Sequence, residues 1–283
     1  MKILSFGEII WDVYDSGAVI GGAPLNFAAN CAYFGEDAYM LSAVGNDELG
    51  DRSFESLEKF GVGTEYIARN DKPTGFCSVT LDERAVPHYE IANDVAYDRI
   101  NADKNIKGED FDLLYFGTLA QRSEHNRNTL KELLSCGFGC VFCDVNIRAP
   151  FFDKERLMLC FKNADVLKIS REELETFTKA VLGEGVTDIE TAAKRLCAAA
   201  PKIKVLIITL DSDGAAAYDA VQNRLYTEPC VKTRVVSTVG AGDGFSAAFI
   251  CKYQKTKDIE KALKSAVEFA AKIVSVKDAV IVR

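Results

Sequence analysis

Near the C-terminus, small residues and one carboxylate follow each other in the order that a phosphate-binding loop requires. Gly240, Ala241 and Gly242 directly precede Asp243. The residues before them, 232–236, have a β-like pattern and those after them, 245–250, have a helical one, which predicts a strand-to-helix junction. First-turn amides and the helix dipole favour an anion, and glycine allows close approach. The segment predicts an anion hole with Asp243 within reach of a reacting hydroxyl.

A Gly-rich loop can also end in an aspartate that does no more than cap a helix. A second segment, near the N-terminus, favours the functional interpretation. Gly21 and Gly22 follow the first expected strand, Ile3–Ile10, and precede an apolar helix that starts at Asn26. Asp12 stands close to the end of that strand. The two ends of the chain therefore both carry small residues beside polar groups.

The elements that must position these groups alternate between short apolar stretches and helical patterns. The expected strands after the first are Ala38–Ala43, Leu113–Phe116, Val141–Asp144, Val166–Ile169 and Val205–Leu210, and the expected later helices are Glu48–Phe60, Glu124–Leu134, Arg171–Leu182 and Ile189–Ala199. This alternation predicts a parallel sheet flanked by helices, whose ligands bind beyond the carboxyl ends of the strands. Asp12, Asp144 and residues 237–243 all follow strand ends, so we expect one shared site.

Two segments interrupt the alternation. Residues 13–20 and 74–91 have the period-two pattern of a small antiparallel sheet. Nine cysteines, an odd number, in a chain with no visible export signal favour buried thiols over a disulfide framework. Cys140 and Cys143 form a CxxC on an apolar strand, where residues three apart point to opposite faces, so they are expected to pack structurally.

Composition excludes several classes of protein. The chain has 283 residues, of which 48% are hydrophobic, enough for a large core in one domain spanning 1–283. A net charge of −8 argues against nucleic acid as a partner. No apolar run approaches the roughly 18 residues that span a bilayer, and the N-terminus enters a strand directly, so a cytoplasmic protein without a membrane partner is expected. His88 and His125 have neither triad nor zinc spacing, which leaves a carboxylate as general base.

Taken together, these segments resemble the ribokinase-like (PfkB) carbohydrate kinases over nearly the whole chain. In that family a GG-containing N-terminal motif holds the sugar and a C-terminal GAGD motif carries catalysis. The resemblance implies a three-layer αβα core with a mainly parallel sheet and a small antiparallel β lid, here about 12–20 and 74–100, through which a homodimer can form. It also implies a sugar and a nucleotide as ligands, with ATP and Mg²⁺ as cofactors.

The resemblance assigns roles residue by residue. The implied catalytic residues are Asp243, Gly240, Ala241, Gly242 and Arg148; the sugar contacts are Asp12, Gly22, Asn26, Gln121, Arg122 and Asp243; the nucleotide contacts are Thr209, Asp211, Gly214 and Gly242; and Glu173 is linked indirectly to Mg²⁺. Asp12 alone would more often be a cap or turn residue, and Arg148 a surface ion pair. Their joint occurrence in the family's order favours the functional assignment.

Five stretches look like bacterial fructokinases in particular: 7–12, 73–75, 95–98, 117–123 and 144–148. They favour D-fructose, phosphorylated on its 6-hydroxyl. A ribokinase, a 2-keto-3-deoxygluconate kinase, a nucleoside kinase or a catalytically weak sugar-binding protein on the same fold remain alternatives. A Walker ATPase or an N-terminal Rossmann dehydrogenase is disfavoured, because neither GxxxxGK[ST] nor a GxGxxG after the first strand is present.

Four departures from the family pattern fall mostly on the nucleotide side. Ser170 replaces the Asn of an NxxE motif, Asp211 replaces a glycine of TxGxxG, Ser237 replaces an Asp that helps to bind a monovalent cation, and Asp278 stands where glycine is common. A carboxylate at position 211 can repel ATP phosphates. The sequence therefore predicts an intact sugar side, an altered nucleotide side and a doubtful monovalent-cation site.

Overall fold

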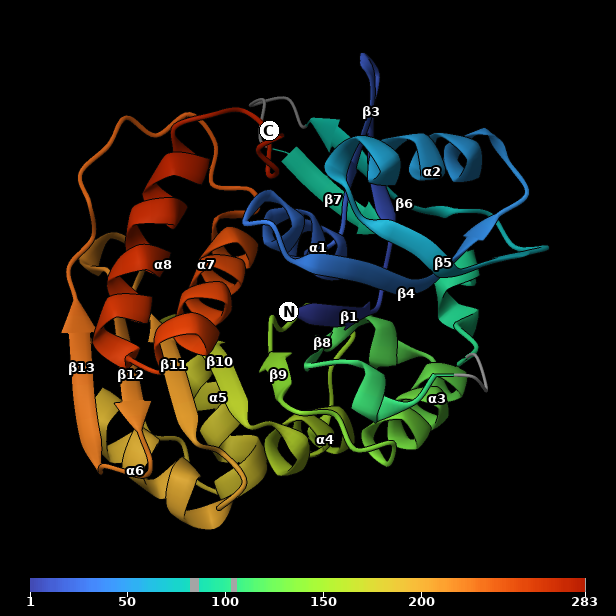
Figure 1. Ribbon diagram of the computed structural model, residues 1–283. Coiled ribbons are helices and arrows are strands. Elements are labelled where there is room, and N and C mark those ends of the chain that lie inside the picture. Colours follow the sequence, from blue (N-terminus) through green and yellow to red (C-terminus); the bar gives the residue numbers. More distant parts are fainter. Residues whose placement is uncertain (82–86, 103–105, 283) are drawn as a thin grey trace.

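The computed structural model describes residues 1–81, 87–102 and 106–282 (Figure 1). Within them, nine strands form a large sheet in the order β13-β12-β11-β10-β9-β8-β1-β4-β5. Its strands are β1 (Lys2–Phe6), β4 (Asp37–Gly45), β5 (Gly63–Asn70), β8 (Leu113–Phe116), β9 (Val141–Asp144), β10 (Val166–Ser170), β11 (Val205–Thr209), β12 (Ala215–Asp219) and β13 (Arg224–Glu228). The pairs from β5 to β11 are parallel, and β12 and β13 add an antiparallel edge.

Eight helices cover the two faces of this sheet in the described part of the chain. They are α1 (Ala23–Tyr33), α2 (Glu48–Phe60), α3 (Glu124–Leu134), α4 (Lys154–Asn163), α5 (Arg171–Leu182), α6 (Ile189–Ala199), α7 (Ala241–Thr256) and α8 (Ile259–Val274). Apolar residues of α1, α7 and α8 share one core cluster, whereas those of α3 to α6 share the other. Successive strand residues such as Ile3 and Leu4 enter opposite clusters, as the alternation of a pleated strand requires. The predicted three-layer α/β fold is confirmed.

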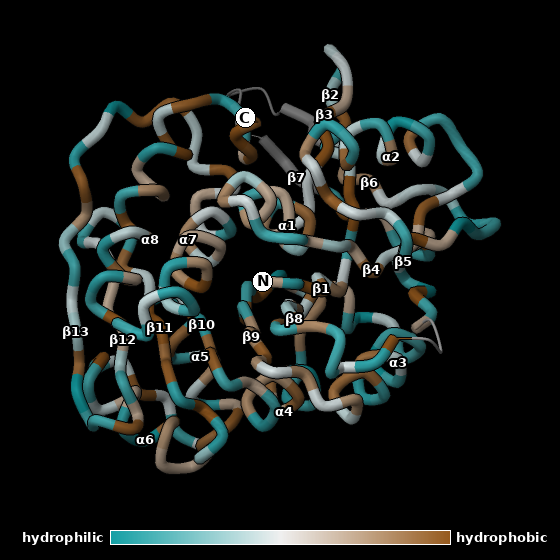
Figure 2. The backbone as a smooth tube through the Cα atoms, in the orientation of Figure 1, coloured by the Kyte–Doolittle hydropathy of each residue, from teal (hydrophilic) through white to brown (hydrophobic). Residues whose placement is uncertain are grey.

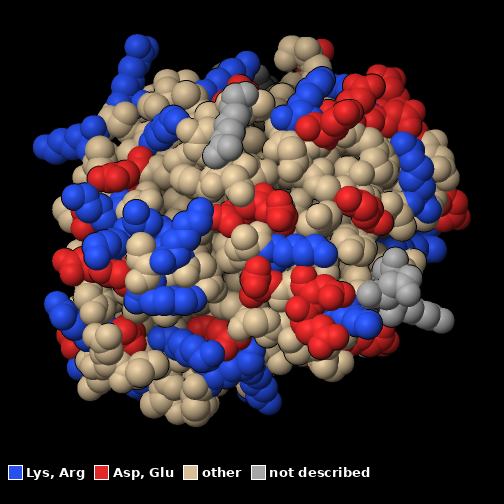
Figure 3. Space-filling view, viewed as in Figure 1, with Lys and Arg blue, Asp and Glu red and all other residues tan. Residues whose placement is uncertain are grey.

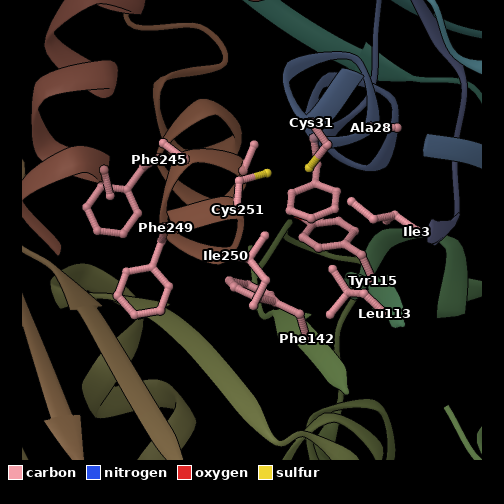
Figure 4. Close-up of a cluster of buried hydrophobic side chains, with 14 of the residues drawn as sticks. Ile3, Ala28, Cys31, Leu113, Tyr115, Phe142, Phe245, Phe249, Ile250 and Cys251 are labelled. Carbon is pink, nitrogen blue, oxygen red and sulfur yellow. The ribbon is translucent and has the colours of Figure 1, made fainter. Parts of the chain in front are cut away.

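The helices nearest the site pack on the sheet through aromatic side chains. Figure 4 shows Ile250 of α7 next to Phe142 of β9, with Cys31 of α1 and Cys251 of α7 pointing toward each other. Phe27 of α1 stacks on Tyr115 of β8 with ring centroids 3.8 Å apart. In Figure 2 the apolar colour follows the strands and the helix faces that lie on them. Apolar burial of this kind fixes α1 and α7 side by side.

A second, four-stranded sheet has the order β3-β2-β6-β7 and lies beside α2 (Figure 1). Its strands are β2 (Ile10–Tyr14), β3 (Gly17–Gly21), β6 (Gly75–Leu81) and β7 (Pro87–Ile91). The pairs β2–β3 and β6–β7 are antiparallel, as expected for the segments 12–20 and 74–100, and the central pair β2–β6 is parallel. Residues 82–86 of the expected lid lie outside the described residues, and 96–99 form a 3₁₀ turn.

Two predicted strands were wrong. The first strand does not run from Ile3 to Ile10: β1 ends at Phe6, and the chain enters the small sheet at Ile10. Buried apolar residues continue through this break, so hydrophobicity cannot reveal it. Residues 232–236 form no strand, because their β-branched side chains are exposed and no strand pairs with them.

Cys140 and Cys143 fall in opposite core clusters, which confirms the predicted structural packing. Seven cysteines are buried and Cys136 and Cys230 are exposed. No helix in the described ranges is both long and apolar enough to cross a membrane. Figure 3 shows acidic and basic side chains interspersed on the visible face, with acidic groups gathered over α2. Local charge therefore decides where an anion can bind.

Asp47 connects the two sheets. Its carboxylate caps α2 by accepting from Gly50 N at 2.8 Å, and it also accepts from Thr74 N at 2.8 Å and Thr74 Oγ1 at 2.6 Å, directly before β6. Burial raises the pKa of Asp47, but the hydrogen bonds from Thr74 and Gly50 outweigh it and lower the pKa overall. One ionised side chain thus holds the small sheet against α2.

Asp47→Ala should lower the free energy of unfolding by about 2–3 kcal/mol, because a helix cap and a buried amide of Thr74 both lose their acceptor. Glu58→Ala, at an exposed position of the same helix, should change it by less than about 0.5 kcal/mol. Urea denaturation of both variants measures the difference. Equal stability of the two variants would contradict the assigned connection.

Candidate active site

The N-terminus of α7 forms the predicted anion-binding loop. Gly240 caps the helix in the left-handed conformation, with φ of 76°, and a Cβ at this position would collide with Ala279. Gly244 N donates to Gly240 O at 2.8 Å and closes the first turn. The amides of Gly242 and Asp243 lie in that turn, where no intrahelical acceptor exists, and Gly242 is exposed. The loop can therefore offer N–H groups to an anion.

Asp243 lies buried directly behind these amides. Its Oδ2 accepts a 2.8 Å hydrogen bond from Asn26 Nδ2 of α1, across 217 residues of sequence. Burial raises the pKa of Asp243 to about 6, against the opposing effects of the Asn26 hydrogen bond and the cations Lys168 and Arg148. A carboxylate with this pKa is ionised at neutral pH and can still accept a proton.

The start of α1 supplies the other half of the site. Gly22 is the N-cap, with φ of 113°, and a Cβ there would lie 2.5 Å from Glu8 O, so only glycine fits. Asn26 is 5% exposed, and within the described residues its Oδ1 has no hydrogen-bond partner. A buried acceptor without a donor is unfavourable by about 1–3 kcal/mol. Asn26 therefore presents an open acceptor beside Asp243, suited to a hydroxyl.

Glu8 is a site residue that the sequence analysis missed. It follows β1, is 4% exposed, and its side chain lies beneath Gly22. Burial raises the pKa of Glu8 to about 7, and the negative charge of Asp243 adds to the shift. An acidic residue inside the apolar run 6–11 was the available signal. The candidate site thus has two buried carboxyl groups with raised pKa values.

A buried ion pair underlies the α7 loop. Lys168 Nζ of β10 lies 2.7 Å from Asp144 Oδ2 of β9, with side chains only 8% and 3% exposed. Ser246 Oγ of α7 donates to the same carboxylate oxygen at 3.1 Å. Lys168 Nζ also lies 3.4 Å from the position that a Cβ on Gly242 would take. Burial lowers the pKa of Lys168, but the effect of Asp144 outweighs it and the net shift is upward.

Arg148 and Asp12 flank the same carboxyl groups. Arg148 follows β9 and is exposed, and its charge acts on Glu8, Asp12 and Asp243. Burial raises the pKa of Asp12, with Arg148 opposing the shift. Asp12 lies in the central pair of the small sheet, opposite Val19 and Cys77. The structure therefore brings Asp12, Gly22, Asn26, Arg148 and Asp243 together around Glu8.

Gln121 and Arg122 serve other contacts in the structure. Gln121 is fully buried, and its Nε2 donates to Gly117 O at 2.7 Å and to Cys160 Sγ at 3.3 Å. Arg122 donates from Nε and Nη2 to Asp98, at 2.7 and 2.8 Å. Among the described residues, neither side chain has a hydrogen bond to Asp243, Asn26 or Asp12.

The expected nucleotide side lies at the ends of β11 and β12. Thr209 ends β11, and Asp211 follows in an exposed turn with φ of 52°. Glycine adopts that conformation readily, whereas it costs Asp211 some strain. Gly214 has φ of 104° and is packed against Glu228 O. Arg171 forms an ion pair with Asp213 at 2.8 Å and so offsets the charge of that carboxylate. The negative charge that this turn has and the family pattern lacks is therefore that of Asp211.

Glu173 and Ser170 form a reciprocal cap at the start of α5. Ser170 Oγ accepts from Glu173 N at 3.2 Å, and Glu173 Oε2 accepts from Ser170 N at 2.8 Å. Glu173 Oε1 accepts from Ile147 N, next to Arg148. The described ranges contain no cluster of three or more His, Cys, Asp or Glu side chains that could hold a metal ion. Glu173 therefore holds the loop that carries Arg148.

Ser237 and Asp278 lie on the two segments that border the α7 loop. Ser237 Oγ accepts from Val239 N at 3.2 Å, and Ser237 N donates to Val274 O at 3.3 Å. Asp278 is exposed, while its neighbour Ala279 contacts Gly240 and accepts from Asn30 Nδ2 at 3.3 Å. The C-terminal segment thus braces α1 and the anion loop through its backbone.

Comparison with known proteins identifies this arrangement. Residues 4–282 match the pfkB family carbohydrate kinase model. The chain belongs to this family. An uncharacterized sugar kinase from Archaeoglobus fulgidus is 30% identical over 234 residues, covering 80% of this chain and 86% of its own. A probable fructokinase-5 from Arabidopsis thaliana is 26% identical, with 95% of this chain and 88% of its own covered.

The solved structures agree with the family assignment. A sugar kinase from Pyrococcus horikoshii in complex with ATP superposes with a TM-score of 0.81 and 26% identity, covering 98% of this chain and 93% of its own. The fold and the family are therefore shown over nearly the full length of this PfkB kinase.

Lys168→Met should lower the free energy of unfolding by about 3–5 kcal/mol, because Asp144 then stays buried without its cation. Replacing both partners, as Asp144→Asn with Lys168→Met, should restore part of that loss. Lys204→Met removes a lysine that is 61% exposed in its pair with Asp165 and should cost less than about 1 kcal/mol. Urea denaturation of the three variants measures their free energies of unfolding. A double variant less stable than Lys168→Met would show that the loss does not come from leaving Asp144 without its cation.

Proposed function

We propose that this PfkB kinase transfers the γ-phosphoryl group of ATP to a sugar hydroxyl, with D-fructose and its 6-hydroxyl as acceptor. The observation that carries the proposal is Asp243, a buried carboxylate behind the first-turn amides of α7 and hydrogen-bonded to Asn26 of α1. An anion site and a base for a hydroxyl are the two requirements of phosphoryl transfer. The fructokinase relative supports the choice of acceptor.

The sugar side of the proposed site combines acceptors and one cation. Asn26 Oδ1 and the Asp12 carboxylate accept from hydroxyls, the backbone at Gly22 lets the sugar approach closely, and Arg148 donates. Several fixed hydrogen-bonding groups of this kind orient a polyol. Asp243 then takes the proton of the attacking hydroxyl.

The phosphoryl side is formed by Gly240, Ala241 and Gly242. The amides of Gly240 and Gly242 hold the transferring oxygens, whereas Ala241 N already donates to Thr238 O at 3.3 Å. Lys168, paired with Asp144, adds a buried positive charge behind Gly242. Thr209, Asp211 and Gly214 line the proposed nucleotide side. Bound Mg²⁺ would neutralise phosphate charge, and it is normally held mostly by water and phosphate oxygens. Glu173 contributes indirectly, by fixing the loop before Arg148.

The small sheet serves as a lid in this proposal. It carries Asp12, and closing it over the sugar would exclude water and so suppress hydrolysis of ATP. Val19 of β3 is 52% exposed, and Tyr14 of β2 is 38% exposed. These side chains offer an apolar edge for the homodimer proposed through the lid.

Asp243→Asn should reduce kcat at least about 100-fold with little change in sugar affinity, because general-base catalysis contributes 10²–10⁴-fold. In the wild type, kcat/KM should fall about tenfold per pH unit below pH 6, since the pKa of Asp243 is about 6 and only the ionised form accepts a proton. A coupled ADP-release assay across pH measures both. Near wild-type turnover of the variant would remove Asp243 as the base.

D-Fructose alone should raise the melting temperature, since it binds only the folded state, and Asn26→Ala should abolish the shift. Asn163→Ala is the matched control, because that side chain donates to Leu159 O within its own helix, α4. Thermal unfolding with fructose, ribose and adenosine tests the acceptor. A shift with ribose or adenosine but not fructose would replace the proposed substrate by that ligand.

Asp211→Asn and Asp211→Gly should both lower the KM for ATP, by about threefold or more, because each removes a negative charge from the proposed nucleotide side. Asparagine tolerates the left-handed conformation, so only Asp211→Gly should also relieve strain and stabilise the fold. Initial rates against ATP concentration give the KM. An unchanged KM in both variants would show that this carboxylate does not face the phosphates.

A further inference from the structure

A separate pocket of about 280 Å³ lies where η3 (Leu119–Arg122), the start of α3 and the segment after Arg148 meet. Arg122, Arg156 and Phe151 line it, together with Asp98 and Ser123. Pro150, also in the lining, is two residues from Arg148, and the charge of the site residue Glu8 acts on Arg122, so the pocket flanks the candidate active site. Of its lining residues, only Arg122 has a role assigned above, as an expected sugar contact.

Arg122 has donor capacity that the described protein atoms leave unused. Its side chain is 6% exposed, and its guanidinium lies between the rings of Tyr97 and Phe151, 4.7 and 5.0 Å from their centroids. Asp98 and Ala92 O accept from Nε and Nη2, whereas Nη1 has no hydrogen-bond partner among the described residues. A buried N–H without an acceptor is unfavourable, so an acceptor is missing from this arrangement.

Arg156 of α4 repeats the pattern from the other side of the pocket. Its Nη2 donates to Arg122 O at 3.3 Å. Its Nε lies 3.5 Å from Asp153 Oδ2, yet this buried atom has no hydrogen-bond partner within the described residues. Two guanidinium groups with unused N–H donors therefore line one pocket.

The surrounding charge favours an anion. Ser123 is the N-cap of α3, an 11-residue helix, so the positive end of its dipole lies at the pocket wall. Each guanidinium already has one carboxylate partner, Asp98 for Arg122 and Asp153 for Arg156, so the unused N–H donors and the helix dipole are what attract a further anion. A planar guanidinium fork recognises carboxylate and phosphate oxygens better than any neutral group.

We propose that this pocket binds one carboxylate or phosphate group through Arg122 and Arg156. The group can be carried by an acidic or phosphorylated sugar that takes the place of the neutral D-fructose proposed above, because the pocket flanks the Arg148 loop, or it can belong to a free anion. The proposal does not depend on the kinase reaction, since binding can be measured directly.

The test is calorimetric titration of the full chain with inorganic phosphate and with D-gluconate, both in the presence of a saturating non-hydrolysable ATP analogue. Arg156→Gln should weaken binding of at least one of these probes by about tenfold or more, because it removes a charge-assisted hydrogen bond. Lys131→Gln, which removes a charge from exposed α3 near Glu155, should change it less than about twofold. Arg156→Lys keeps the charge without the fork and should give an intermediate loss.

The two probes distinguish the sources of the group. If Arg156→Gln weakens the binding of D-gluconate alone and leaves D-fructose binding unchanged, the anionic group belongs to the acceptor. If Arg156→Gln weakens the binding of phosphate alone, the pocket binds a free anion. If neither probe binds, or if binding is the same in Arg156→Gln and the wild type, the pocket is not an anion site. Should Arg156→Gln fail to fold, Arg156→Lys decides by the same comparison. None of these outcomes requires turnover, so they stand apart from the test of Asp243.

Discussion

Everything at the centre of this protein depends on keeping several carboxyl groups buried together. Asp243, Glu8 and Asp144 are each less than one tenth exposed. Isolated buried carboxylates would protonate, because burial disfavours the charged form. Lys168 supplies a buried cation, Asn26 and Ser246 supply hydrogen bonds, and Arg148 adds charge from the exposed side. The large sheet serves this arrangement by ending β9 and β10 at Asp144 and near Lys168, beneath α7.

The sequence predicted the parts of the site that depend on local backbone. Glycines next to Asp243 and before Asn26 indicated two helix starts, and both helices begin at or close to the expected positions. Glu8 and Lys168 were missed, because their importance comes from neighbours far away in the sequence. The break after Phe6 was missed for the converse reason: burial continues through it although the chain changes sheets. Residues 232–236 have strand propensity but no strand beside them, so tertiary context overrides the pattern.

At two of the departures from the family pattern, the effect on the backbone can be distinguished from the effect on the charge. Ser170 still caps α5 with its hydroxyl, and Asp211 still adopts the positive φ that glycine would take. At both positions the residue present satisfies the local backbone, as a cap or in a positive-φ turn, and the chemistry that it presents to a ligand differs from that of the family's residue. Asparagine, aspartate and serine can all substitute in turns and caps, since each bonds to nearby backbone. A sequence motif alone cannot distinguish a changed shape from a changed charge.

The hydrogen bond between Asn26 and Asp243 joins positions 217 residues apart. During synthesis on the ribosome, α1 emerges early, and its apolar face stays uncovered until α7 has been synthesised. Phe27, Ala28 and Cys31 share a core cluster with Phe249 and Ile250, so until α7 follows, this early segment is a surface for chaperones or for aggregation. Non-local pairing of this kind also slows folding, because the loop must close before its contacts stabilise it. A nascent chain that stops before α7 therefore lacks both the hydrogen bond between Asn26 and Asp243 and the anion-binding loop.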